Sequence, residues 1–151
     1  MIGVSFALLD FFEQYEIPVW ENLLVIETGG MKGRREEMTR EELHERLQKH
    51  HPGLRIASEY GMTELLSQAW SNGEGIFNCP PWMKVLIRDE EDPFQINERG
   101  RGTINIIDLA NIYSCSFIAT DDAGKLKEDG SFEVLGRVDG SDLRGCSLMI
   151  V

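Results

Sequence analysis

The order of short apolar runs and one capped helix near the start of the chain constrains its fold most. Residues 23–26 and 54–58 are apolar runs that predict buried strands. Between them, Thr39 and Glu42 have the spacing of a capping box, in which each side chain accepts a hydrogen bond from the other residue's backbone N–H. A second short helix is predicted over residues 62–70. Strand, helix, strand and helix in this order, with glycine-containing joints, predict an α/β layer with parallel strands.

The first sixteen residues predict another helix, because apolar side chains dominate them. Asp10 and Glu13 interrupt the apolar run and no basic segment precedes it, so it resembles neither a signal peptide nor a membrane span. We expect an apolar face of this helix to be exposed if the chain is alone, which favours a homo-oligomer. Its early position also suggests a chain that begins inside a larger fold.

The pattern changes near residues 71–75, and from there short strands alternate with turns. Residues 83–88, 102–107 and 131–135 are the clearest predicted strands. We therefore expect an α/β subdomain over residues 1–72, followed by a small, mostly antiparallel β subdomain over residues 73–151.

Charge and cysteine content exclude several classes of partner. The 151 residues carry 15 Lys+Arg and 26 Asp+Glu, for a net charge of −11. Nucleic acids and anionic membrane surfaces attract basic proteins, so neither is an expected partner. The three cysteines form no Cys-x-x-Cys pair, which argues against a disulfide framework or a zinc site and favours a cytoplasmic location.

One candidate site lies at the junction after the second predicted strand. Gly61 lets a ligand approach the backbone, Thr63 can donate to a phosphate oxygen, and Tyr60 can stack on a base. Glu64 would repel a phosphate unless a hard cation such as Mg²⁺ lay between them. The alternative is an ordinary helix cap, in which Thr63 and Glu64 serve only the local backbone.

A second candidate cluster consists of residues 120–124 and 136–140, on either side of a predicted hairpin turn. A carboxylate here can accept hydrogen bonds from both hydroxyl groups of a ribose, and a nearby arginine can bind sugar or phosphate. The alternative is that Asp and Gly only form turns at these positions.

Together these segments resemble the AMP-forming, adenylate-forming ligase superfamily, which includes acyl-CoA synthetases, peptide-synthetase adenylation domains and luciferases. Residues 60–64 match its Tyr-Gly-x-Thr-Glu motif. Residues 120–124 resemble its Thr-Gly-Asp-x-Gly motif, with Asp121 in place of the glycine. Residues 136–139 resemble its Gly-Arg-x-Asp hinge, and residues 29–30 its Gly-Gly turn beside adenine. Residues 27–33 and 142–148 resemble one branch more closely, the LuxE-type acyl-protein synthetases, which activate a fatty acid.

The resemblance implies a role for each matching residue in binding ATP or AMP. Gly29, Gly30, Tyr60 and Gly61 would contact adenine or the acyl pocket, and Thr63 would bind the α-phosphate. Asp122 would bind the ribose hydroxyls, with Arg137 on ribose or phosphate. The catalytic set would be Thr63, Glu64 as the Mg²⁺ ligand, and Cys146 as acyl acceptor, with Asp139 as hinge. The alternative for Cys146, given equal weight, is that it only packs in the core as a small apolar side chain.

The sequence also departs from the superfamily. Residues 1–57 contain no Ser/Thr/Gly-rich phosphate loop, and no lysine-carrying lid domain follows Arg137. The resemblance therefore implies the C-terminal half of an acyl-adenylating ligase for a fatty or other carboxylic acid, with a companion chain supplying the N-terminal phosphate loop. Two alternatives stay open: a non-catalytic module for nucleotide binding or protein interaction, and a piece of a phenylacetate-CoA ligase-like synthetase.

Overall fold

The computed structural model describes residues 1–16, 18, 20, 22–31, 35–36 and 38–138. This part of the chain forms two compact units. The first unit comprises Met1–Glu59 with Asn72–Glu74, and the second comprises Tyr60–Ser71 with the described residues from Gly75 onward. The chain thus passes from one unit to the other at Tyr60, whereas the subdomain boundary at residues 72 and 73 stays a prediction.

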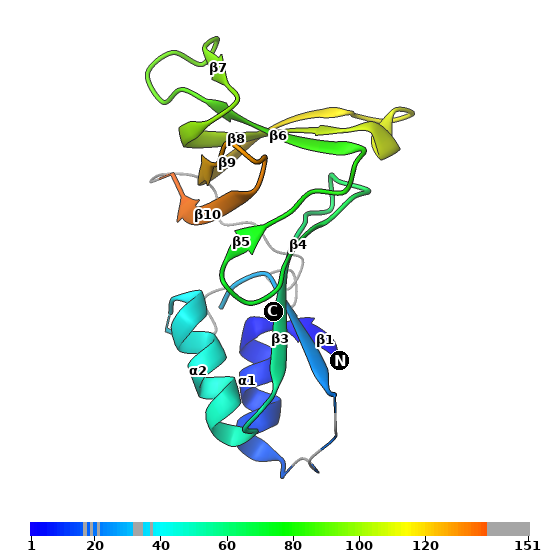
Figure 1. The fold of residues 1–151 in the computed structure, drawn as a ribbon, viewed down its shortest axis with the longest axis vertical. Coiled ribbons are helices and arrows are strands. Elements are labelled where there is room, and N and C mark those ends of the chain that lie inside the picture. Colours follow the sequence, from blue (N-terminus) through cyan, green and yellow to red (C-terminus); the bar gives the residue numbers. More distant parts are fainter. Residues whose placement is uncertain (17, 19, 21, 32–34, 37, 139–151) are drawn as a thin grey trace, which may run out of the picture. The chain divides into compact units, whose positions relative to one another are not determined.

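The first unit is a parallel α/β layer, as the sequence predicts. Its elements are β1 (Ile2–Val4), α1 (Ser5–Gln14), β2 (Leu24–Thr28), α2 (Arg40–His50) and β3 (Arg55–Tyr60), whose last residue begins the second unit. Strand β2 pairs in parallel with β1 on one side and with β3 on the other. The two helices lie side by side next to these strands (Figure 1).

The capping box predicted at the start of α2 is present. The Thr39 N–H donates to Glu42 Oε2 at 2.8 Å, and the Glu42 N–H donates to Thr39 Oγ1 at 3.2 Å. Leu43 and Leu47, one turn apart, are buried in the core of the unit. Local sequence therefore determines where this helix begins and which face it buries.

The apolar face of α1 is buried, which corrects the expectation that it would be exposed. Leu8, Leu9 and Phe12 are each no more than 4% exposed and share a core with apolar residues of α2, β2 and β3. The sequence analysis also missed β1, whose three residues are too few to give a pattern. The homo-oligomer stays a prediction, now without support from this helix.

The second unit contains an antiparallel sheet of six strands in the order β5-β10-β9-β8-β6-β7 (Figure 1). All of its pairings are antiparallel, which confirms the predicted β-rich character. Its core includes Phe77, Ile87, Ile104, Ile106 and Phe132, each at most 1% exposed. The elements are β4 (Ala69–Ser71), β5 (Ile76–Phe77), β6 (Met83–Arg88), β7 (Ile96–Asn97), β8 (Gly100–Asp108), η1 (Leu109–Asn111), β9 (Phe117–Leu126) and β10 (Phe132–Arg137).

The helix predicted over residues 62–70 is wrong, because this segment is a loop that leads into β4. The buried carboxylate of Asp108 accepts hydrogen bonds from backbone N–H groups that would otherwise bond within a helix. Its Oδ2 accepts from the N–H groups of Leu66 and Ser67, each at 2.9 Å, and its Oδ1 accepts from the Ser67 hydroxyl at 2.7 Å. A distant side chain thus overrides the local helical pattern.

Among the described residues, no helix is both long enough and apolar enough to cross a membrane.

Candidate functional site

The residues matching the ribose-binding motif form a bulge in β9. Thr103 of β8 faces Ala123, while Asn105 faces Ala119, so β8 advances by two residues where β9 covers four. The register of β9 with β10 also shifts, between Val134 and Gly136. Bulges of this kind re-aim side chains at the edge of a functional site. The alternative that residues 120–124 only form a turn is therefore wrong, because they belong to the irregular strand β9 (Phe117–Leu126).

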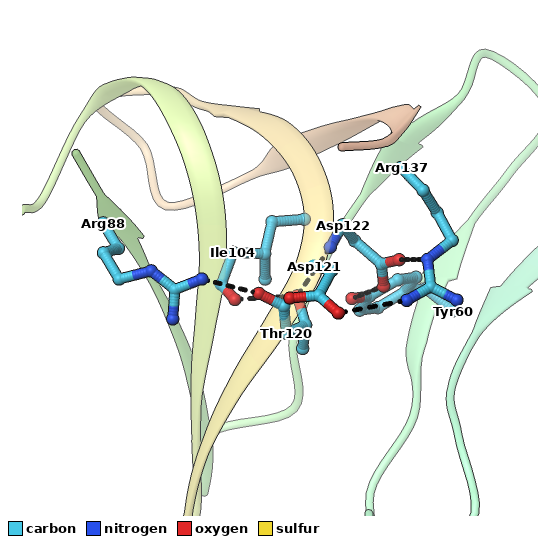
Figure 2. A network of polar contacts seen from close by, with 7 residues as sticks. All are labelled: Tyr60, Arg88, Ile104, Thr120, Asp121, Asp122 and Arg137. Atoms are coloured by element: carbon cyan, nitrogen blue, oxygen red, sulfur yellow. Dashed lines mark hydrogen bonds and ion pairs between the residues drawn. The ribbon is translucent and has the colours of Figure 1, made fainter. Parts of the chain in front are cut away.

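Asp122, within this bulge, brings together three segments that are far apart in the sequence. The Tyr60 hydroxyl donates to Asp122 Oδ2 at 2.8 Å, and Arg137 Nε lies 3.7 Å from Asp122 Oδ1. Arg137 Nη2 also donates to Asp121 Oδ2, at 3.3 Å. Figure 2 shows the two carboxylates meeting the guanidinium of Arg137. Three predicted nucleotide-binding residues, Tyr60, Asp122 and Arg137, are therefore in contact.

The Tyr60 side chain is positioned by the packing of its ring, and its hydroxyl makes the contact with Asp122. The side chain is 8% exposed, and its ring packs edge-on against Phe77 and Phe132, with centroids 6.0 and 5.4 Å away. Burial, and then the negative charge of Asp122, raise the pKa of the phenol. Tyr60 consequently remains a hydrogen-bond donor to Asp122, while its stacking on a base stays a prediction.

The bulge is held by Thr120 and Arg88 (Figure 2). The Thr120 hydroxyl donates to the Ile104 carbonyl at 2.8 Å and accepts from the Asp122 N–H at 3.1 Å. Arg88 Nη2 donates to the Thr120 carbonyl at 2.9 Å. These contacts replace strand hydrogen bonds that the bulge disrupts, and they fix the backbone on which the Asp122 carboxylate is carried.

At the last position of this motif, Gly124, there is no room for a side chain. A Cβ at Gly124 would lie 2.6 Å from Ile104 Cδ1 and 2.9 Å from the Glu133 carbonyl oxygen, closer than packed atoms tolerate. Gly124 therefore lets β8 and β10 approach β9 closely beside the bulge.

The other half of the motif that begins at Tyr60 is exposed. Gly61, Thr63 and Glu64 lie on the surface, and the Thr63 hydroxyl donates to Glu64 Oε2 at 3.0 Å. No helix begins here, so a helix N-terminus cannot supply phosphate-binding N–H groups as the sequence analysis expected. The described residues contain no group of three or more metal-ligating side chains, so Glu64 would need ligand oxygens or water to complete a Mg²⁺ site.

Gly29 and Gly30 belong to the first unit, at the end of β2. Gly29 has a φ of +70°, which glycine adopts readily, and its carbonyl accepts from the Ser5 hydroxyl at 2.9 Å. The same hydroxyl lies 3.2 Å from Glu27 Oε2, and Arg40 Nε donates to Glu27 Oε1 at 2.9 Å. Burial alone would raise the pKa of Glu27, but the surrounding hydrogen bonds and the Arg40 charge hold it below its usual value. A cavity of about 650 Å³ in this unit, between α2 and β3, does not include the glycine turn.

Asp139, the predicted hinge, and Cys146, the predicted acyl acceptor, lie outside the described residues. Their roles stay predictions. The other two cysteines, Cys79 and Cys115, are free thiols. Burial raises the pKa of Cys79 to about 11, so this thiol is largely un-ionised at neutral pH.

Sequence reasoning missed two residues that position the site, Arg88 and Asp108. Arg88 ends a predicted strand, and its guanidinium crosses neighbouring strands to donate to Thr103 Oγ1, Asn105 Oδ1 and the Thr120 carbonyl. Asp108 is 0% exposed, and its only local sign is that it caps η1 by accepting from the Ala110 N–H at 3.1 Å. Nothing local predicts the long-range partners of either residue.

Comparison with known proteins identifies the fold. No protein-family model matches the sequence, and neither does any curated protein. Solved structures do resemble it. The o-succinylbenzoate CoA synthetase MenE from Bacillus subtilis is 21% identical with a TM-score of 0.63, and ATP-bound MatB from Rhodopseudomonas palustris is 18% identical with a TM-score of 0.62. The benzoate CoA ligase from Burkholderia xenovorans LB400 is 16% identical with a TM-score of 0.58.

These similarities cover 90–91% of this chain and 30% of each of the three solved chains. The chain therefore has the fold of a part of these three proteins, and it spans about a third of their length.

Proposed function

We propose that this chain carries the ribose-binding part of an ATP-dependent acyl-adenylating ligase. The observation that carries the proposal is the contact of Tyr60, Asp122 and Arg137, which come from three separate motif segments. A shared fold with a benzoate CoA ligase, a CoA synthetase and the ATP-bound MatB supports the same kind of reaction. A site assembled from residues of β3, β9 and β10 is harder to explain by ordinary turns, which need no contact between distant motifs.

In the proposed reaction, a carboxylate oxygen of the acid attacks the α-phosphorus of ATP. The bond to pyrophosphate breaks, and acyl-AMP forms. Asp122 accepts hydrogen bonds from the two ribose hydroxyls, and Arg137 balances negative charge beside it. Thr63 donates to an α-phosphate oxygen, and Glu64 would hold Mg²⁺, which would stabilise negative charge on the phosphates. The chain's part in catalysis is thus positioning and stabilisation of charge.

The acyl group then passes to a thiol. In the LuxE-type reading, the thiolate of Cys146 attacks the acyl carbonyl carbon, a thioester forms and AMP leaves. The fatty acid, the protein thiol and a companion chain with the phosphate loop belong to this finer proposal. Coenzyme A is the alternative acceptor, and the similarity to CoA ligases favours it. In that case the acid would be activated by a phenylacetate-CoA ligase-like enzyme.

A non-catalytic nucleotide-binding or interaction module is the second candidate function. The contacts of Asp122 with Tyr60 and Arg137 favour it as well, because binding a ribose requires no reaction. Such a module would keep the Asp122 contacts and bind AMP without responding to Mg²⁺.

The test is calorimetric titration of the 151-residue chain with AMP, with ATP, and with ATP plus Mg²⁺. Asp122→Ala should weaken AMP binding at least about tenfold, because two hydrogen bonds to a charged acceptor are lost. Glu64→Gln should leave AMP binding intact and remove the gain in ATP affinity that Mg²⁺ gives. Glu128→Gln is the matched control, since it removes one negative charge from an exposed ion pair with Arg99 in the same unit.

The outcomes separate the candidate functions. AMP binding that depends on Asp122, with Mg²⁺-dependent ATP binding, supports the ligase. AMP binding without a Mg²⁺ effect supports the nucleotide-binding module. Failure of the chain to bind either nucleotide would refute the ribose site.

A further inference from the structure

Two consecutive carboxylates meet one guanidinium at the bulge in β9. Arg137 Nη2 lies 3.3 Å from Asp121 Oδ2, and Arg137 Nε lies 3.7 Å from Asp122 Oδ1 (Figure 2). The proposed function uses Asp122 and Arg137 but gives Asp121 no role. Asp121 is also the residue at which the sequence departs from the Thr-Gly-Asp-x-Gly pattern.

The backbone and the side chain of Asp121 are both held. Its carbonyl accepts from the Val138 N–H at 2.9 Å, so its main chain is tied to the end of β10. Its side chain is 48% exposed, against 19% for Asp122, although both face the same cation. A ligand bound to Asp122 from solvent therefore meets a second carboxylate close beside the first.

Charge determines what such a ligand can be. The trio of Asp121, Asp122 and Arg137 carries one net negative charge. Hydroxyl groups of a ribose donate to carboxylates and are favoured there. A phosphate on either hydroxyl would bring up to two negative charges to within a few ångströms, and its dianionic form would have no hydrogen to donate.

Resting on the proposed function, we propose that Asp121 is a specificity-determining residue. It makes the site select a nucleotide whose ribose has both hydroxyls free and reject one that is phosphorylated there. The excluded class includes the adenosine 3′,5′-bisphosphate group of coenzyme A. The site thereby keeps the nucleotide portion of a thiol acceptor from competing with ATP.

The test compares the affinities of AMP and adenosine 3′,5′-bisphosphate for the 151-residue chain and its variants, by calorimetry at low salt. The wild-type chain should prefer AMP at least about tenfold. Asp121→Asn, which keeps the shape of the side chain, should reduce this ratio at least about threefold, and Asp121→Gly should reduce it as well. Glu128→Gln removes the same charge at an exposed ion pair and should leave the ratio unchanged.

The ratio of the two affinities distinguishes selection from simple support of Arg137. If Asp121 only positions Arg137, both ligands weaken equally in Asp121→Asn and the ratio stays at the wild-type value, which overturns the inference. Equal binding of both nucleotides by the wild-type chain also overturns it, while leaving the proposed function intact. Absence of AMP binding would refute the proposed function and, with it, this selection.

Discussion

The two segments that carry the candidate site are stabilised in different ways. The loop over residues 61–67 depends mainly on one buried carboxylate, that of Asp108, which accepts from Leu66 and Ser67. One further side chain, that of Asn111, donates to the Glu64 carbonyl at 2.8 Å. The bulge over residues 120–122 depends on several moderate contacts from Thr120 and Arg88 and on the space that Gly124 leaves. The loop should therefore fail as a whole when one side chain is lost, whereas the bulge should weaken by steps.

The largest effect is expected for Asp108→Ala. The substitution leaves at least three N–H groups and the Ser67 hydroxyl without their acceptor in or near a buried position, which should cost about 4 kcal/mol of unfolding free energy. Urea unfolding measures it. Asp108→Asn keeps one acceptor oxygen and should lose clearly less. A loss under about 1 kcal/mol in Asp108→Ala would contradict the single-carboxylate account.

A smaller loss, about 2–3 kcal/mol, is expected for Gly124→Ala, because the added methyl overlaps Ile104 and the Glu133 carbonyl. The same unfolding measurement checks it. Ile104→Val removes the nearest atom, so the double variant should recover part of the loss relative to the two single variants. Strictly additive effects would mean that the close approach to Ile104 is not the cause.

For the bulge itself, Thr120→Val should cost about 1–2 kcal/mol. Valine keeps the shape of threonine but leaves the Ile104 carbonyl and the Asp122 N–H without their partner. Thr120→Ser retains the hydroxyl and serves as the control. Equal losses in the two variants would assign the effect to packing instead of hydrogen bonding.

Lowering the pH below about 3.8 should produce the smallest effect on stability and the clearest difference between the two segments. The pKa of Asp108 is lowered: burial opposes ionisation, but hydrogen bonds from Ser67, Leu66 and Ala110 outweigh it. A depressed pKa contributes stability that is present above the unfolded value of about 3.8 and is lost as the pH falls through the folded value. In the bulge, by contrast, the contacts of Thr120 are made by a hydroxyl, which is not an acid or base in this range.

Hydrogen exchange of backbone amides, measured at decreasing pH and corrected for intrinsic rates, checks this difference. Protection at Leu66 and Ser67 should fall before protection at Asp122. Asp108→Asn should abolish the pH dependence at Leu66 and Ser67 but not change that at Asp122. Simultaneous loss of protection in both segments of the wild-type chain would contradict the proposed independence.

The elements predicted correctly are those whose signal is local. The capping box of Thr39 and Glu42 determines the start of α2, and the apolar runs correspond to β2 and β3. For residues 83–88 the predicted strand and β6 have the same bounds. In these segments, propensity, apolar pattern and tertiary environment agree, so the sequence alone is sufficient.

The errors fall where a distant group decides the backbone. Residues 62–70 have a helical pattern, but Asp108, some forty residues later, takes their N–H groups. Strand β9 was missed because its bulge breaks the alternation that identifies a strand. The motifs identified Tyr60, Asp122 and Arg137 as candidate site residues. They did not predict that the three side chains meet, because that contact depends on strand register.

The order of strands in the second unit has a consequence for how the chain is made. β5, at residues 76–77, pairs with β10, at residues 132–137, so its partner is synthesised more than fifty residues later. The parallel pairings of the first unit, in contrast, are all available once residue 60 has emerged. We expect the strands of the first unit to assemble on the ribosome before Phe132, the partner of Phe77, has been synthesised. During synthesis the candidate ribose site can form only after β10 has emerged, because Arg137 is the last residue of that strand.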